Sequence, residues 1–182
     1  MSVIEGQTAV FSPDGQTIAA FQLGGKVQLW EVSTRSIRTN LVLDPPPRSV
    51  MALSPDGRIL ATTTGAWDFD NAIYLWDLVY GLRLGALVGH QESVVSVAFS
   101  PDGRTVASSS SGGILKLWHL ATQQELFAIQ APRGDLMFSP DGQWLVSRSR
   151  FAATNEPIYL HAPLLENDPA GPAGFGPLSE SP

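Results

Sequence analysis

Three residues of the chain have the types that hydrolytic chemistry requires. His90, Ser108 and Asp102 could supply the base, the nucleophile and the carboxylate of a catalytic triad. The chain contains no G-x-S-x-G segment, the turn that exposes the nucleophilic serine in many hydrolases. Asp102 also belongs to Ser100–Gly103, SPDG, whose residue types are typical of a tight turn. The sequence therefore favours structural roles for these residues and predicts no catalytic site.

Metal and cofactor chemistry have equally little support. The chain contains no cysteine, and the spacing of His90, His119 and His161 fits no zinc site. Residues 67–71, WDFDN, faintly resemble a calcium loop but lack its third ligand, its glycine and its distant glutamate. We expect no metal ion and no cofactor.

The charge balance argues against polyanionic partners. The chain carries 17 acidic residues against 11 Lys and Arg, and only Lys26 and Lys116 are lysines. Because binding to phosphates or to anionic lipids needs clustered basic residues, we expect neither nucleic acid nor a membrane as a partner. The first residues have no basic segment followed by an apolar run, so the sequence predicts no signal peptide and a cytoplasmic location.

Two motifs recur four times in constant order. The first motif ends in SPDG and occupies Phe11–Gly15, Leu53–Gly57, Phe99–Gly103 and Phe138–Gly142. The second motif reads VQLWEV from Val27, IYLWDL from Ile73, LKLWHL from Leu115 and, in decayed form, IYLHAP from Ile158. A fixed order of motifs at a period of roughly 40 residues indicates a repeat architecture.

The sequence pattern of each repeat predicts four short antiparallel strands. SPDG supplies a turn whose glycine accepts a positive φ, and apolar residues alternate on both sides of it. Both faces of each small sheet carry apolar residues, so each sheet must be covered on both sides. Stacked sheets of this kind form a β-propeller.

On these residues the chain resembles the WD40 repeat family. Trp76 and Asp77 match the Trp-Asp pair of that family, and Gly89 and His90 match its Gly-His pair. The resemblance implies an all-β fold, a propeller-type array of four antiparallel four-stranded blades that forms an open arc or a partial propeller. We expect blades at about 2–44, 45–89, 90–131 and 132–162, within a domain at 1–162. A disordered Pro/Gly-rich tail is expected at 163–182, with no outer strand for the fourth blade after Ala162.

The resemblance also implies hydrogen bonds that join a His, a Ser or Thr, an Asp and a Trp within a blade. The residues at these structural positions are Trp30, Trp76, Trp118, His90, Ser108, Thr62 and Asp70. Gly112 stands at the Asp position of the third blade, and the first blade offers only its tryptophan, with Ala20 elsewhere. We therefore expect these sets to be incomplete and the blades to depend on apolar packing.

Two connections between second and third strands are longer than the others, Thr64–Ala72 and Arg148–Pro157. In the family these loops lie on a face that is often used for binding, and aromatic residues and arginine dominate many interfaces. The candidate partner-binding residues are Trp67, Asp68, Phe69, Arg148, Arg150 and Phe151. The alternative is that these loops fold back over the blade edge.

The sequence thus predicts a non-catalytic WD40 repeat scaffold that mediates protein–protein interaction. Two alternatives stay open, a partial propeller of a larger regulatory or enzymatic protein, for example one with a kinase or protease domain, and a propeller hydrolase. The ends of the array carry no evident polar caps, which repeat arrays need. We therefore expect self-association, completion by blades of another chain, or a strained ring closed by Ser2–Ile4.

Overall fold

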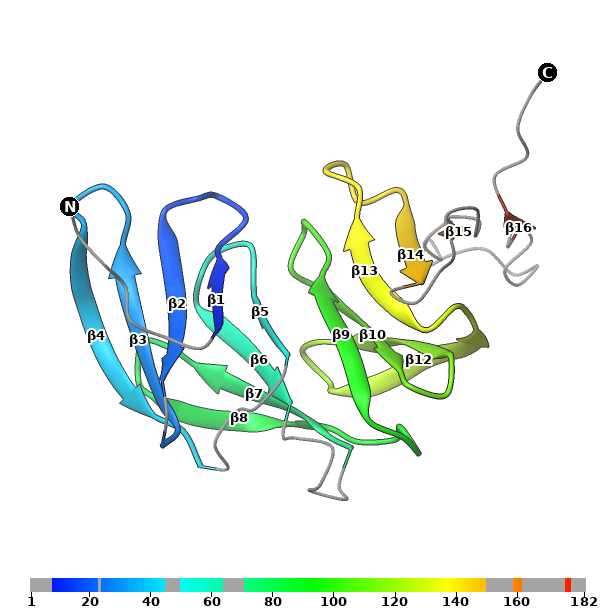
Figure 1. Cartoon of the computed structure of the whole chain (residues 1–182), viewed down its shortest axis with the longest axis horizontal. Coiled ribbons are helices and arrows are strands. Elements are labelled where there is room, and N and C mark those ends of the chain that lie inside the picture. Colours follow the sequence, from blue (N-terminus) through cyan, green and yellow to red (C-terminus); the bar gives the residue numbers. More distant parts are fainter. Residues whose placement is uncertain are drawn as a thin grey trace.

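The computed structural model describes residues 8–22, 24–44, 50–63, 71–149, 159–161 and 176–177 (Figure 1). All regular structure in these residues is β-strand, arranged as four antiparallel sheets of four strands each. The predicted all-β fold class is confirmed. Within the same residues there is no helix with the length and hydropathy of a membrane span.

The first two sheets are formed by the first two sequence repeats. The first sheet consists of β1 (Thr8–Phe11), β2 (Thr17–Gln22), β3 (Lys26–Glu31) and β4 (Ser36–Val42). The second consists of β5 (Met51–Leu53), β6 (Ile59–Thr63), β7 (Ile73–Asp77) and β8 (Leu82–Leu87). Each strand pairs with the next along the chain, so every sheet is a simple meander.

The last two sheets have the same topology. The third consists of β9 (Val94–Phe99), β10 (Thr105–Ser110), β11 (Ile114–His119) and β12 (Gln124–Gln130). The fourth consists of β13 (Gly134–Phe138), β14 (Leu145–Ser149), β15 (Tyr159–His161) and β16 (Gly176–Pro177). The expectation that this sheet lacks an outer strand is wrong, because β16 pairs with β15. A two-residue strand of glycine and proline has no hydrophobic period that the sequence could reveal.

The four SPDG turns share one hydrogen-bond pattern. In each, the serine hydroxyl donates to the aspartate, as from Ser100 to Asp102, and accepts the amide five residues on, as from Thr105. The aspartate also accepts the amide two residues after itself. The glycine φ values lie between +65° and +71°, which confirms the predicted left-handed position.

Each turn packs on the turn of the preceding repeat. A Cβ atom built on Gly103 would lie 3.7 Å from Pro55 Cδ, and one on Gly142 would lie 3.5 Å from Pro101 Cδ. These are ordinary van der Waals separations. The backbone conformation, rather than a clash, therefore requires glycine at these positions.

Successive sheets enclose three apolar clusters. We call the face of a sheet toward the following sheet its forward face, and the opposite face its rear face. The forward face of the second sheet, with Ala61, Ile73, Leu75 and Leu87, packs with the rear face of the third, with Val97, Phe99, Val106 and Trp118. The same arrangement joins the first sheet to the second and the third to the fourth. Apolar residues on both faces of each sheet are thus buried by its neighbours.

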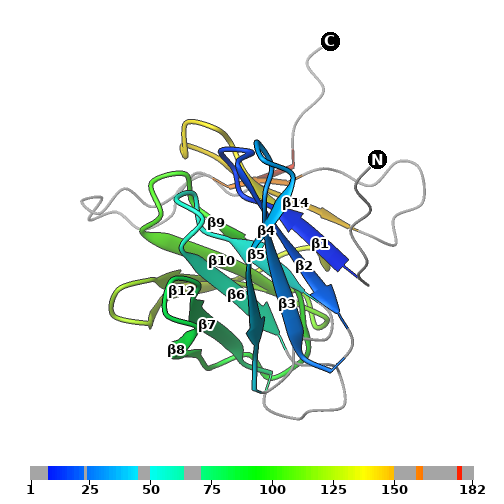
Figure 2. The same ribbon diagram turned by 90° about the vertical axis from the view of Figure 1, so that its left-hand side faces the viewer.

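The sheets fan out around their inner strands. β1 contacts β5, β5 contacts β9, and β9 contacts β13. Figure 1 shows the first sheet at the left of the fan and the fourth at the right, with the fan open toward the top. Figure 2 looks from the side of the first sheet and shows its strands in front of the others. The array is an open arc; Ser2–Ile4, the proposed closing strand, lie outside the described residues.

Replacing Gly103 by valine should destabilise the protein by about 1–3 kcal/mol, because a β-branched residue resists a φ of +70°. Gly103→Asn is the matched control, and it should cost less because asparagine tolerates this conformation better. Urea unfolding measures both. Equal stability of the valine variant and the wild type would contradict the strain argument.

Replacing Trp118 by alanine should cost about 3–5 kcal/mol, because it leaves a cavity between the second and third sheets. Trp118 is 1% exposed, whereas Trp144, in the turn before β14, is 44% exposed. Trp144→Ala should therefore cost much less. Thermal unfolding of the two variants checks the prediction, which fails if they lose equal stability.

Candidate interaction site

Ser108 is the centre of a buried hydrogen-bond network in the third sheet. Its Oγ accepts the indole N–H of Trp118 at 2.8 Å and lies 2.7 Å from His90 Nε2. The His90 ring also meets the Trp118 ring edge-on. Ser108 is fully buried and His90 is 5% exposed, so a substrate has no access to the hydroxyl. Asp102 takes no part, because its carboxylate bonds within the turn at the other end of the β9–β10 hairpin.

Burial sets the charge state of His90. The pKa of His90 is lowered to about 4, mainly because the ring is removed from solvent and also because the Lys116 ammonium is near, whereas Glu125 opposes the shift. The imidazole is therefore neutral at pH 7. A neutral ring whose Nε2 bonds a buried serine ties the segment before β9 to β10, as the resemblance implied.

Another carboxylate, that of Glu92, lies near the position where the third sheet lacks an aspartate, but the buried Nδ1 of His90 has no hydrogen-bond partner in the described part of the chain. Glu92 lies over Gly112, so closely that a Cβ atom at residue 112 would be 2.7 Å from the Glu92 Oε1. The other carboxylate oxygen accepts the Ser111 hydroxyl at 3.0 Å. A side chain at residue 112 would have to displace the end of the flexible Glu92 side chain, which joins the segment before β9 to the β10–β11 turn through Ser111. Sequence reasoning missed Glu92, although the glycine at an expected Asp position was a signal.

The hydrogen-bond sets around Trp76 and Trp30 are less complete than the set around Trp118. Trp76 Nε1 donates to Thr62 Oγ1 at 2.9 Å, as predicted, whereas Asp70 lies outside the described residues. Trp30 Nε1 is buried and has no hydrogen-bond partner in the described part of the chain, because Ala20 stands where the hydroxyl is needed. The first sheet therefore keeps the tryptophan without its polar partner.

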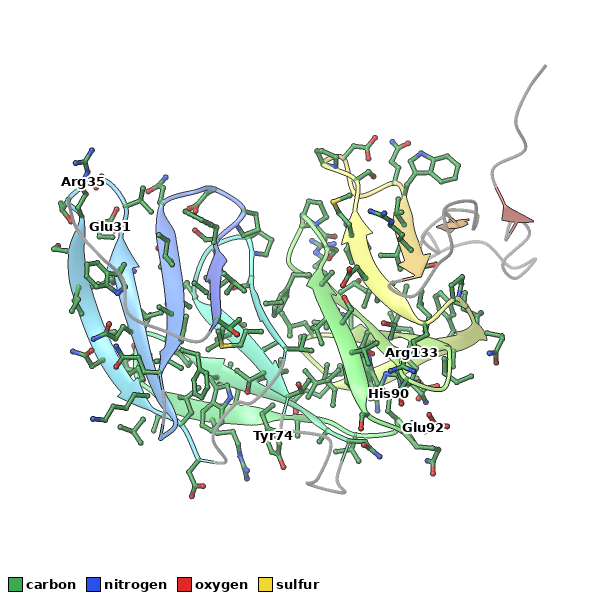
Figure 3. All side chains as sticks on the ribbon, in the orientation of Figure 1. Glu31, Arg35, Tyr74, His90, Glu92 and Arg133 are labelled. Atoms are coloured by element: carbon green, nitrogen blue, oxygen red, sulfur yellow. The ribbon has the colours of Figure 1, made fainter. Side chains whose placement is uncertain are left out.

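The end of the sheets that carries His90 is the candidate interaction site. Figure 3 shows Tyr74, His90 and Glu92 along the lower edge, away from Glu31 and Arg35 at the upper edge. The Arg83 guanidinium lies 5.5 Å from the centre of the Tyr74 ring, a cation–π contact that the sequence did not reveal. We call this end the loop face.

The long connections of the second and fourth sheets run between defined strand ends. β6 ends at Thr63 and β7 begins at Ile73, whereas only Ser111–Gly113 separate β10 from β11. Thr63 and Ile73 form the last pair of the β6–β7 ladder, next to the connection. Ala72, at the end of this connection, is buried. The second sheet therefore has the longer connection that the sequence predicted. This connection starts and ends at paired strands, at the loop face.

The predicted partner-binding residues are only partly placed by the structure. Trp67, Asp68, Phe69, Arg150 and Phe151 lie outside the described residues. Arg148 was assigned to a loop, but it belongs to β14, because its pairing with Asp135 extends the ladder to Gly134 and Ser149. Its exposed side chain lies on the forward face of the fourth sheet.

The described residues include no group of three or more His, Asp or Glu side chains that could hold a metal ion.

Four-stranded meanders that stack face to face around their inner strands are the blades of a β-propeller, here in an open array. Residues 41–77 and 81–119 match the family model described as WD domain, G-beta repeat. The chain therefore belongs to the WD40 repeat family.

Several curated proteins are similar to most of the chain. Telomerase protein component 1 of Rattus norvegicus is 32% identical over 146 residues, which cover 79% of this chain and 5% of the relative. An uncharacterized WD repeat-containing protein of Synechocystis is 29% identical over 75% of this chain and 39% of its own length. COMPASS component SWD3 of Saccharomyces cerevisiae is 31% identical over 63% of this chain and 35% of its own length. The chain thus spans less than half of each relative.

The pKa of His90 predicts a dependence of stability on pH. Its folded value of about 4 lies below the ordinary histidine pKa of 6.5, so the unfolded chain binds a proton more readily between these values. The free energy of unfolding should therefore decrease as the pH falls from about 6.5 toward about 4. Urea unfolding at pH 7, 6 and 5 should show a shallower decrease for His90→Gln. Identical pH profiles of variant and wild type would contradict the assignment.

Proposed function

We propose that the protein is a non-catalytic scaffold whose WD40 blades bind another protein through the loop face. The observation that carries the proposal is the burial of the Ser108 hydroxyl and His90. The residues that could have formed a hydrolase site instead hold strands and turns together. This favours the scaffold over the propeller hydrolase.

The names of relatives support the same role. One relative is named a telomerase protein component and another a COMPASS component. By analogy, we propose that this chain acts by joining other proteins. We also propose a cytoplasmic location, which rests on the sequence features alone.

The mechanism that we propose is presentation of loops on a rigid frame. The buried links from Trp118 to Ser108 and from Trp76 to Thr62 fix the strands of the third and second blades. Loops that leave such strands lose little further freedom on binding, so a partner meets a surface that is already ordered. Connections of this kind can vary in sequence without disturbing the frame.

Trp67, Asp68, Phe69, Arg150 and Phe151 remain our candidates for partner contact, because aromatic residues and arginine supply much of the energy at many interfaces. Residues 64–72 join strands of the loop face, where Tyr74 and Arg83 already place an aromatic ring beneath a cation. For Arg148, which lies on a blade face, a different partner is argued below.

The experiment compares three forms of the whole chain, the wild type, Trp67→Ala and the control Trp144→Ala. Proteins that bind the wild type are identified by cross-linking, and their dissociation constants are then measured with each purified form. Trp67→Ala should weaken binding at least tenfold, which corresponds to about 1.4 kcal/mol, and Trp144→Ala should leave the affinity unchanged.

Equal affinity of every partner for wild type and Trp67→Ala would remove Trp67 from the interaction site. An esterase and peptidase panel tests the hydrolase alternative. Turnover by the wild type that is abolished in Ser108→Ala would contradict the non-catalytic role.

A further inference from the structure

The two ends of the arc expose faces that are buried inside it. Phe11, Leu53 and Phe99 occupy the same place in their repeats, directly before SPDG. Leu53 and Phe99 are 4% and 7% exposed, because each lies on the rear face of its blade and the preceding blade covers that face. Phe11 lies on the rear face of the first blade and is 64% exposed. At the other end, Met137 on the forward face of the fourth blade is 66% exposed.

The rear face of the first blade is more apolar than its counterparts. Ile37 is the cross-strand neighbour of Trp30, whereas the corresponding neighbours of Trp76 and Trp118 are Arg83 and Glu125. Ile37 and Val32 add to the exposed surface of Phe11 on this side. Extended apolar patches on a folded surface tend to mark interfaces.

Side-chain sizes follow a fixed rule at the three internal interfaces. Three residues before the serine of each SPDG, the rear faces carry the larger residues Met51, Val97 and Leu136. The forward faces that share a cluster with them carry, in the second strand, the small residues Ala19, Ala61 and Ala107. At each internal interface a larger rear residue therefore shares a cluster with a small forward residue.

Both ends of the arc invert this rule. The rear face of the first blade has the small Ala9 where the others have Met51, Val97 and Leu136. The forward face of the fourth blade has the larger Val146 at the alanine position, and Met137 beside it. The small residue thus stands on the rear face at one end, and the larger residue on the forward face at the other. The forward face of a fourth blade is thus complementary to the rear face of a first blade.

Polar groups show the same correspondence. Between the third and fourth blades, Ser96 Oγ accepts the amide of Leu136 at 3.0 Å, and Ser109 Oγ donates to the carbonyl of Gly134 at 2.7 Å. At these two positions the fourth blade carries Asp135 and Arg148. A carboxylate can accept where Ser96 accepts, and a guanidinium can donate where Ser109 donates. Both side chains suit the backbone of a following first strand.

We propose that two copies of this chain close into one eight-bladed ring, with the fourth blade of each copy packed on the first blade of the other. β1 and β13 lie on opposite sides of the fan in Figure 1, so one copy does not bring its own ends together. Two identical contacts related by a two-fold axis form a closed dimer. Eight blades lie within the range known for propellers. This proposal concerns the blade faces and is independent of the loop-face function.

The first experiment measures the mass of the whole chain by light scattering and by sedimentation at several concentrations. The wild type should have twice the chain mass of 19.5 kDa. Phe11→Asp places a charge in the proposed contact and should give the monomer mass. Tyr80→Ser removes an exposed apolar residue from the β7–β8 turn and should remain a dimer.

The second experiment tests the match of sizes. Ala9→Met should raise the dissociation constant of the dimer at least tenfold. Adding Val146→Ala to this variant should restore the constant to within about threefold of the wild type, since the contact then has the large rear residue and the small forward residue of the internal interfaces. Circular dichroism confirms that each variant folds, which the exposed position of Ala9 and the half-buried position of Val146 make expected.

Three results would overturn the proposal. The first is a monomeric wild type at every concentration, and dye binding to it would indicate that other blades cover the ends. The second is a dimer that Phe11→Asp and Ala9→Met leave intact, because the contact would then lie elsewhere. The third is a failure of Val146→Ala to compensate for Ala9→Met in folded protein, because this would show that the two ends do not meet.

Discussion

The structure depends on burial of both faces of each small sheet by its neighbours. A four-stranded sheet with apolar residues on both sides is not stable alone in water, because one covered face leaves the other exposed. Repetition solves this problem, since every blade covers the one before it and is covered by the one after it. The turns at one end contribute to the same stacking, where Gly103 lies against Pro55 and Gly142 against Pro101.

The side-chain hydrogen bonds of the tryptophans are not what makes the blades stack. Ser108 bonds both Trp118 and His90, Thr62 bonds Trp76, and Trp30 has no such partner in the described part of the chain. Nevertheless, the first blade has the same four-stranded topology as the others. The hydrogen bonds therefore orient the tryptophans and hold the loop face, whereas apolar packing determines the stacking. The proposed function and the proposed assembly use different parts of the molecule, the loop ends and the blade faces.

The repeated motifs made most of the fold predictable. The turn chemistry of SPDG specified the positive φ of Gly103, and the tryptophan motifs located the third strands and the partners of Trp118 and Trp76. Features outside the repeat were not predictable. Arg148 was placed in a loop because an arginine next to a turn-like segment shows no strand period, and β16 has no period at all. Which ends of the array are complementary became visible only when the forward and rear faces were assigned.

Amide hydrogen exchange of the whole chain, at a concentration where it is monomeric, tests most directly whether coverage of both faces stabilises a blade. The account predicts slowest exchange in β6, β7, β10 and β11, whose sheets are covered on both sides. The strands β2, β3 and β14 should exchange faster, because their sheets each have one open face. Equal protection in all four sheets would contradict the account, since each sheet would then be stable without a neighbour on one side.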